Sequence, residues 1–209
     1  MRITNMPSGA LRVNTYLAVD EETNKGMIVD PGGYNKALTD EINKNGIQIE
    51  YIVLTHGHSD HICGVNEHKA EFPDAKIIAY KDEAPMLEDP NLNQSPAFGM
   101  PYTVKADIFV NDGDKLPLGN LTLKFFHTPG HTKGGMCIYI EKANVLFSGD
   151  TLFCQSIGRT DFPGGSFKEI SESIKKKLYV LPDNTEVFPG HMGATSIGYE
   201  KENNPFVQM

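Results

Sequence analysis

The chain has 209 residues, of which 39% are hydrophobic and 22% charged, and these proportions are ordinary for a globular protein. Its formal net charge of −8 argues against nucleic-acid and anionic-membrane partners, which need clustered Lys and Arg. The chain has no apolar run of the roughly 20 residues that a membrane helix needs and no apolar signal-peptide core. With three cysteines in no metal or disulfide spacing, we expect a soluble, cytoplasmic protein.

The first half of the chain is predicted to contain a hairpin followed by alternating helices and strands. The predicted elements are strands at 14–19 and 26–30, a helix at 36–46, a strand at 49–55, a helix at 65–72, a strand at 75–80 and a short helix at 81–89. The stretch from Pro90 to Pro101 contains three prolines and is predicted to be a loop, either beside the substrate or as a plain surface excursion.

The second half of the chain is also predicted to contain strands followed by a helix. Residues 116–128 are predicted to form two strands joined at Gly119 and Asn120, and further strands are predicted at 135–140, 144–150 and 185–191. A helix is predicted at 166–181, opened by a capping box of Ser166 and Glu169. Strands and helices in each half favour two sheets packed together with helices outside them.

The stretch VLTHGHSDHICG, from Val53 to Gly64, places three of the seven histidines beside one aspartate directly after a predicted strand. Coincidence is a weak explanation for such an H-x-H-x-D-H pattern. In extended backbone His56 and His58 point to the same side, and Asp60 and His61 fall on the first turn of a following helix. The strand-to-helix loop therefore aims four side chains at one small volume.

Imidazole and carboxylate ligands suit zinc, iron or manganese, and no thiolate is positioned to demand a softer ion. Four adjacent ligands would crowd one ion, and a catalytic site also needs an open position, so further ligands and a second ion are expected. Three candidates each follow a glycine that lets the backbone turn as a predicted strand ends: His131 in TPGHT, Asp150 in SGDT and His191 in FPGH.

This set of motifs resembles the metallo-β-lactamase superfamily along essentially the whole chain. The segments VDPGG, THGHSDH, TPGHT, SGDTLF and PGH occur in the family's order. The resemblance implies an α/β fold of the αββα type, in which two mixed β-sheets are flanked by helices and residues 1–209 form one metallo-β-lactamase-like domain. It also implies a binuclear metal site at one edge of the sheets.

The resemblance further implies a role for each candidate ligand. The first metal ion is expected at His56, His58 and His131, the second at Asp60, His61 and His191, and Asp150 is expected to bridge them. The two divalent ions are expected to be zinc, with iron or manganese as alternatives. An aspartate at position 150, where β-lactam-hydrolysing members often carry cysteine, points toward a binuclear hydrolase.

The stretch GDTLFCQSIGRTDFPGG is similar to short bacterial relatives of glyoxalase II, the hydroxyacylglutathione hydrolase. This similarity implies that Arg159 binds the carboxylate end of glutathione, and an ion pair with Asp161 is the alternative. Asp161 stands where glyoxalase II has a tyrosine. We expect no C-terminal helical domain of the kind that completes the glutathione site in glyoxalase II.

The resemblance implies a small-molecule thioester substrate, with S-(hydroxyacyl)glutathione as the leading candidate. Hydrolysis is expected to proceed through a metal-bound hydroxide, which Asp60 orients as the catalytic residue. The same GRTDF segment also resembles persulfide dioxygenases. That alternative implies a single iron held by His56, His131 and Asp150, a face of two histidines and one carboxylate.

Overall fold

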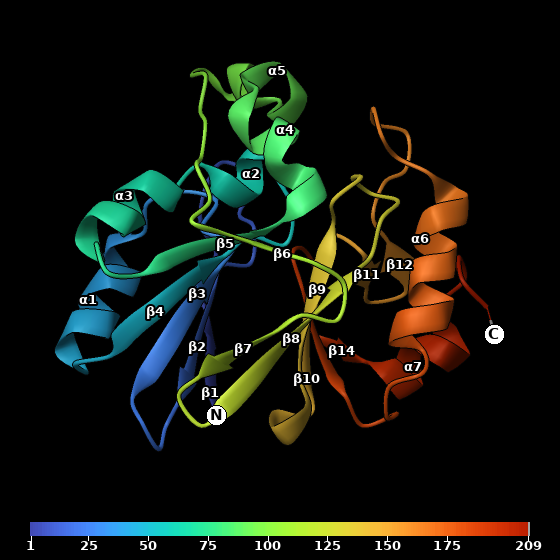
Figure 1. The fold of residues 1–209 in the computed structure, drawn as a ribbon. Coiled ribbons are helices and arrows are strands. Elements are labelled where there is room, and N and C mark those ends of the chain that lie inside the picture. The colour runs from blue at the N-terminus through green and yellow to red at the C-terminus, as the bar shows by residue number, and fades with distance from the viewer. Residues whose placement is uncertain (209) are drawn as a thin grey trace.

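Two β-sheets pack face to face, with helices on both outer faces, in the computed structural model, which describes residues 1–208 (Figure 1). This arrangement confirms the predicted αββα sandwich of two mixed sheets. Figure 1 shows α1 and α3 on the left of the sheets, α6 and α7 on the right, and α4 and α5 above them.

The first sheet combines the predicted hairpin with a parallel section. Its order is β1 (Arg2–Asn5), β2 (Tyr16–Asp20), β3 (Lys25–Val29), β4 (Gln48–Val53), β5 (Lys76–Tyr80) and β6 (Ile108–Val110). The first three strands pair antiparallel, and β3 to β6 run parallel. The pairing of Tyr16 with Val29 confirms the hairpin predicted at 14–30.

The second sheet is mostly antiparallel. Its members in chain order are β7 (Lys115–Leu118), β8 (Leu121–His127), β9 (Met136–Ile140), β10 (Val145–Gly149), β13 (Glu186–Pro189) and β14 (Thr195–Ser196). Only the pairing of β10 with β13 is parallel. A separate hairpin of β11 (Leu152–Phe153) and β12 (Ser156–Ile157) follows β10 near the sheet edge.

The four layers follow from the two-residue period of the strands. In β2, Tyr16 and Ala18 join the apolar cluster between the sheets, whereas Leu17 and Val19 join the cluster beneath the helices of the first sheet. Both faces of the strand are therefore apolar, because each face meets another layer. Phe125 of β8, which is fully buried, belongs to the inter-sheet cluster.

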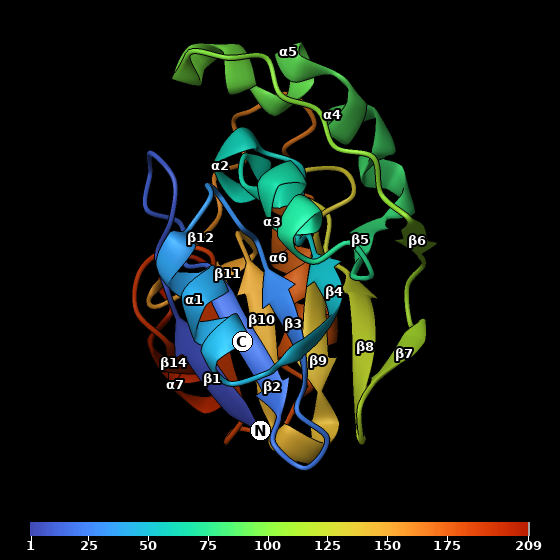
Figure 2. The ribbon, with the colours of Figure 1, turned by 90° about the vertical axis from the view of Figure 1, so that its left-hand side faces the viewer.

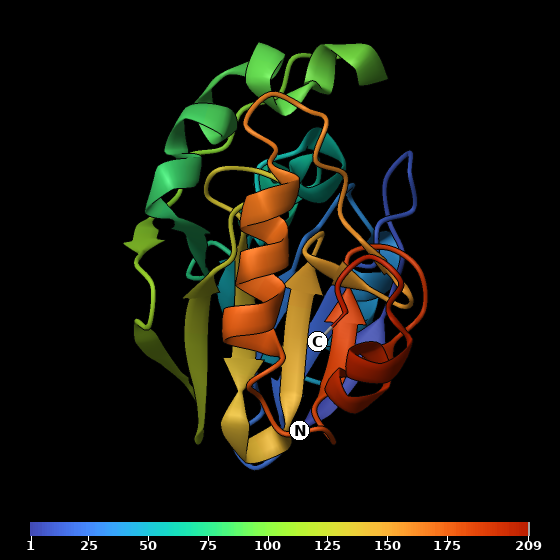
Figure 3. The same cartoon turned by 90° about the vertical axis from the view of Figure 1, so that its right-hand side faces the viewer.

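The helices cover the outer faces of the two sheets. The first sheet carries α1 (Lys36–Lys44), α2 (Ser59–Ile62) and α3 (Val65–Glu71), and Figure 2 shows α1 and α3 lying over it. The second sheet carries α6 (Phe167–Ser173), its π-helical continuation η4 (Ile174–Leu178) and α7 (Ile197–Asn203), as seen in Figure 3. No helix within residues 1–208 is long and apolar enough to cross a bilayer.

Two local predictions need correction. The predicted loop at 90–101 contains α5 (Pro90–Asn93) and η2 (Ser95–Phe98), because the side chain of Asp89 caps the first turn and Pro90 occupies its first position. The capping box at Ser166 is only half formed. Its hydroxyl accepts a hydrogen bond from Glu169 N, but its own N–H donates to the carbonyl of Gly130 rather than to Glu169.

Other elements were not predicted or were predicted with different boundaries. The predicted helix at 81–89 divides into η1 (Lys81–Glu83) and α4 (Ala84–Glu88), and a 3-10 turn, η3 (Glu141–Ala143), joins β9 to β10. No strand or helix was predicted at β1, β6, β14, α7 or the hairpin of β11 and β12. Most of these are short, and their hydrophobic periodicity is too brief to recognise.

Candidate metal centre

All seven predicted ligands lie at one edge of the sandwich, at the C-terminal ends of strands. Four follow β4 and extend into α2, and the others follow β8, β10 and β13: His56, His58, Asp60 and His61, then His131, Asp150 and His191. Glycines shape two of these strand ends. Gly130 has φ of +129° and Gly149 has φ of +49°, conformations that residues with a Cβ rarely adopt.

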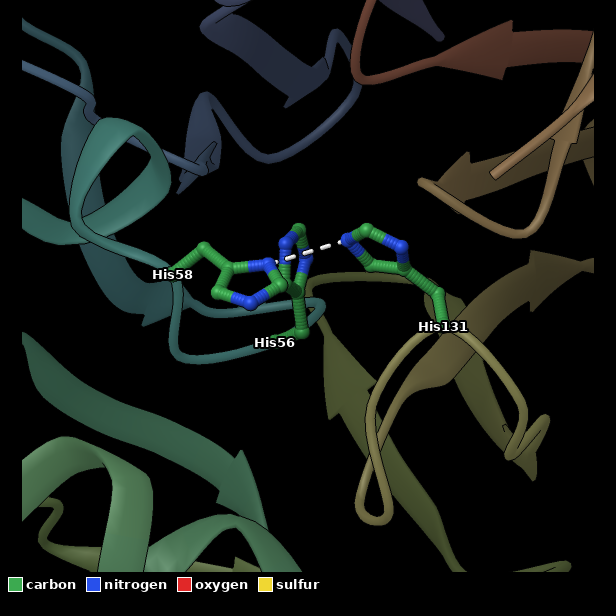
Figure 4. Close-up of side chains that lie close together, drawn as sticks. All are labelled: His56, His58 and His131. Atoms are coloured by element: carbon green, nitrogen blue, oxygen red, sulfur yellow. Dashed lines mark hydrogen bonds between the residues drawn. The ribbon is translucent and has the colours of Figure 1, made fainter. Parts of the chain in front are cut away.

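The first group of side chains consists of His56, His58 and His131, which point toward one another (Figure 4). All three are buried, and one ring nitrogen from each lies within 4.8 Å of the others. His58 Nδ1 is 2.9 Å from His131 Nε2, so the two nitrogens share one proton. A cation bound by both rings would take the place of that proton.

The second group consists of Asp60, His61 and His191, and Asp150 lies between the two groups. Asp60 Oδ2 is 3.1 Å from His191 Nε2 and 3.7 Å from His61 Nε2. The Asp150 carboxylate faces both groups, because Oδ1 is 3.4 Å from His61 Nε2 and Oδ2 is 3.6 Å from His131 Nε2. This position is compatible with the predicted bridging role.

Hydrogen bonds from Nδ1 orient three of the histidine rings. His131 Nδ1 donates to the carbonyl of Arg159 at 2.8 Å, and His61 Nδ1 donates to Asp30 Oδ2 at 2.9 Å. Thr55 Oγ1 donates to Asp30 Oδ2 at 2.6 Å, so it can accept the proton of His56 Nδ1 at 3.2 Å. With its Nδ1 proton committed in this way, each ring presents Nε2 to the site, which is the arrangement of metal-binding histidines.

Asp30 therefore organises both groups of side chains. It is 1% exposed, and besides these bonds its Oδ1 accepts from Thr55 N at 2.8 Å. Its backbone has a positive φ of 49°, a conformation that is uncommon for a residue with a side chain and that turns the chain at the end of β3.

The charge states of the rings follow from burial and from the neighbouring carboxylates. Burial, reinforced by His131, lowers the pKa of His58 to about 3, and burial with His61 nearby lowers the pKa of His56 well below its usual range. Both rings are neutral near pH 7, and the neutral form coordinates cations. Burial disfavours the charged form of His61, but Asp150, Asp60 and Asp30 outweigh it and raise its pKa to about 10.

The residues present fit a cationic metal centre. His56 Nε2, His61 Nε2 and Asp150 Oδ1 are buried and have no hydrogen-bond partner within residues 1–208. Such atoms are costly to bury unless they are paired, and metal coordination would satisfy them. The donors are imidazole nitrogens and carboxylate oxygens, a set that suits zinc, iron or manganese.

Sequence reasoning missed one residue that holds the ligand loops together. Glu83, at the end of η1, is 2% exposed. Its Oε1 accepts from Gly57 N at 2.8 Å, between His56 and His58, and its Oε2 accepts from Gly134 N at 2.7 Å, in the loop that carries His131. Glu83 thus joins the two loops of the first group, although no sequence pattern marks it.

Five of the seven candidate ligands, all except the deeply buried His56 and His61, line a cavity of about 540 Å³, a size typical of small-molecule sites. Arg159 lines this cavity and pairs with Asp161 through Nε at 2.9 Å and Nη2 at 2.8 Å. Its guanidinium stacks on Phe162 at 4.1 Å from the ring centre, and that ring packs edge-on against His58. The predicted ion pair with Asp161 is therefore formed, beside the candidate metal ligands.

An αββα sandwich with this histidine- and aspartate-rich edge defines a metal-binding protein of the metallo-hydrolase class. Residues 8–191 match the sequence profile of the metallo-beta-lactamase superfamily, and the chain belongs to that superfamily. This confirms the resemblance drawn from the motifs.

Curated relatives with similar sequences include two proteins named as hydrolases. The chain is 34% identical to the hydroxyacylglutathione hydrolase GloC of Haemophilus influenzae, over 99% of this chain and 98% of that protein. It is also 34% identical to the probable metallo-hydrolase YqgX of Bacillus subtilis, with the same coverage.

Solved structures with different names show the same fold. The structure of the BLEG-1 B3 metallo-beta-lactamase matches with a TM-score of 0.93 and 38% identity over 100% of both chains. The di-iron-bound form of TTHA1623 matches at 0.86 with 30% identity, over 98% of this chain and 100% of that one. ETHE1 from Myxococcus xanthus matches at 0.79 with 25% identity, over 98% and 84%.

Proposed function

We propose that the protein is a binuclear metal-dependent hydrolase that cleaves thioesters, with S-(hydroxyacyl)glutathione as the leading substrate. The observation that carries the proposal is the convergence of seven nitrogen and carboxylate side chains, some with buried unpartnered atoms, at one edge of the sandwich, where five of them line one cavity. The similarity to GloC over nearly the whole of both chains supports a glutathione thioester. We propose zinc as the metal, and the similarity to the di-iron form of TTHA1623 makes iron the alternative.

In the reaction, water and the thioester give a carboxylic acid and a free thiol. The metal ions at this site would supply a nucleophile from water at neutral pH and polarise the thioester carbonyl. His56, His58, His131 and Asp150 would hold one ion, and Asp60, His61 and His191 would hold the other with Asp150 between them. The chain then needs no serine or cysteine nucleophile.

The chain's own groups position the reactants. Asp60 lines the cavity as a carboxylate that can only accept hydrogen bonds, so it would orient the attacking water toward the carbonyl. Burial opposes its ionisation, but His61 and His191 stabilise the anion and hold its pKa below the usual range. The hydrogen bonds of the buried Asp30 and Glu83 would keep the loops that carry the candidate ligands fixed while the thioester is hydrolysed.

We propose that Arg159 contacts the thiol part of the substrate. Its pair with Asp161 uses two of the five N–H donors of the guanidinium, so Nη1 remains for a glutathione carboxylate. Stacking on Phe162 fixes the plane of the guanidinium beside the cavity.

Two other activities have a specific observation in their favour. The similarity to ETHE1 supports persulfide dioxygenation by a single iron at His56, His131 and Asp150. The high structural similarity to BLEG-1 supports a test of β-lactam hydrolysis, although this chain carries Asp150 where such enzymes often carry cysteine.

One preparation distinguishes the three activities. Bound metal is measured first, and the same protein is then assayed for thiol release from S-lactoylglutathione, oxygen uptake with glutathione persulfide, and opening of a chromogenic β-lactam. We expect two metal ions per chain with thiol release only. A single iron with oxygen uptake, or β-lactam opening without thiol release, would overturn the proposal.

A further inference from the structure

A second cavity adjoins the metal-side cavity. It has a volume of about 300 Å³, and Ser59, Asp60 and Phe98 line both cavities. Asp60 therefore stands at the junction, with the candidate ligands on one side and the second cavity on the other. A substrate whose reacting carbonyl lies beside Asp60 can extend one of its two ends into this space.

The walls of the second cavity are chiefly apolar. Phe98 and Met100, which are 45% and 69% exposed, line it from the segment after α5, and Ala10 lines it from the turn after Ser8. Large apolar side chains exposed around a cavity are typical of a surface that a ligand covers. The ring of Tyr102 also lines the cavity, while its hydroxyl bonds Glu67 Oε2 at 2.7 Å.

The charges of the two cavities differ. Among the described residues, the only charged side chains that line the second cavity are Asp60 and Glu67, both acidic, and no Lys, Arg or His lines it. The metal-side cavity also has acidic side chains, Asp60 and Asp150, but Arg159 and three histidines line it as well. An anionic group would be repelled from the second cavity and attracted toward Arg159, so the two cavities suit chemically different ends of one substrate.

We propose that the second cavity binds the apolar acyl chain of the thioester, while the charged thiol part lies on the Arg159 side. This inference rests on the proposed thioester hydrolysis and extends it to the substrate class. A volume of about 300 Å³ equals that of roughly ten water-sized groups at about 30 Å³ each, so it holds an unbranched acyl chain of about six to eight carbons.

Binding tests the cavity independently of catalysis. The probes are S-alkyl thioethers of N-acetylcysteamine, from methyl to octyl, which cannot be hydrolysed and carry no charge. Calorimetry with the metal-loaded protein should show affinity rising up to about fourfold for each added methylene and levelling off near hexyl or octyl. Affinity that stays flat along the series would overturn the inference.

Ala10→Phe places a large ring at the wall of the second cavity, and Ala70→Phe on the exposed surface of α3 is the matched control. Ala10→Phe should lower the octyl-to-methyl affinity ratio at least tenfold, whereas Ala70→Phe should leave the ratio at its wild-type value. Equal ratios in both variants would place the alkyl chain elsewhere and contradict the proposal. Far-ultraviolet circular dichroism establishes that both variants are folded.

Hydrolysis then separates the two proposals. Acyl thioesters of glutathione from acetyl to octanoyl should show kcat/KM rising with chain length in wild type and losing that rise in Ala10→Phe. If S-lactoylglutathione and the whole acyl series are inert while thioether affinity still rises with chain length, the proposed function fails and the apolar subsite stands. Hydrolysis without any dependence on chain length would retain the function and remove the subsite.

Discussion

Asp30 and His61 form a buried hydrogen bond, with Oδ2 of Asp30 accepting from Nδ1 of His61 at 2.9 Å. The same carboxylate oxygen accepts a hydrogen bond from the hydroxyl of Thr55. The oxygen of that hydroxyl also lies within hydrogen-bond distance of His56 Nδ1. One carboxylate from the end of β3 therefore orients a histidine in each of the two groups of candidate ligands. It also holds the loop that follows β4, on the neighbouring parallel strand.

Asp30→Asn should weaken metal binding without removing a ligand. The amide keeps one acceptor oxygen, but its NH₂ group cannot accept a hydrogen bond from Thr55 or His61. Loss of such an outer partner typically costs 10- to 100-fold in metal affinity. Competition with a coloured chelator measures this effect, and Asp74→Asn on the surface is the control. Wild-type affinity in Asp30→Asn would show that the bond to His61 does not orient the ring.

Because Glu83 is buried, we expect its contribution to the stability of the fold to decrease as the pH rises. Burial raises its pKa to about 7 from the ordinary value of 4.5, although hydrogen bonds from Gly57 N and Gly134 N oppose the rise. Because the folded state binds the proton more tightly, this contribution to stability is complete below pH 4.5. It is lost as the pH rises through 7, by a total of about 3 kcal/mol.

Glu83→Gln should remove that dependence, since the amide does not ionise. The difference in free energy of unfolding between variant and wild type should shift in favour of the variant by up to about 3 kcal/mol from pH 4.5 to pH 7.5. Urea unfolding of the metal-free proteins measures this shift, and Glu88→Gln on the surface of α4 is the control. A difference that is independent of pH would mean that Glu83 ionises as it does in the unfolded chain.

The fold and the candidate ligands were largely predictable because their signals are local. The alternation in β8 and the apolar runs of β2 to β5 reflect layers on each side, and the glycines before His131 and Asp150 mark the turns that end two strands. Sequence patterns of this kind show the hydrophobic periodicity of a strand or helix and the residue types at its end.

The supporting contacts were not predictable for the opposite reason. Glu83 bonds the backbone of Gly57 and Gly134, and a backbone N–H leaves no trace in residue type. The carbonyl of Arg159 that orients His131 is likewise independent of its side chain. The second cavity depends on α5 and η2, which bring Phe98 beside α2. This segment was predicted to be a loop because it contains three prolines.

If Arg159 binds a carboxylate of the substrate, its substitution should raise KM for a charged thioester but not for a neutral one. Arg159→Ala should raise KM for S-lactoylglutathione about tenfold or more, because a hydrogen bond to a charged group is worth about 1.5–3 kcal/mol. The corresponding neutral thioester of N-acetylcysteamine should show no such change. Asp161→Asn should lower KM for the glutathione substrate, because the carboxylate no longer competes for the guanidinium. A KM that changes equally for both substrates would assign Arg159 a structural role.

Metal removal should destabilise the protein, because a cation at the candidate site would satisfy buried atoms of His56, His61 and Asp150 that have no other partner within residues 1–208. A cation present at 100 times its dissociation constant stabilises the folded state by about 2.7 kcal/mol. For a chain of this size, that corresponds to a rise of about 5–10 °C in Tm.

Calorimetric scans of the chelated and zinc-reconstituted protein measure this increment. His131→Ala should abolish most of it. His127→Ala is the matched control, because His127 stacks on Tyr80 at 4.1 Å and bonds the carbonyl of Lys133, outside both groups of ligands. This control should lower Tm in both states and keep the metal-dependent increment, since it removes packing but no ligand. An increment lost equally from both variants would mean that the metal stabilises the protein from another site.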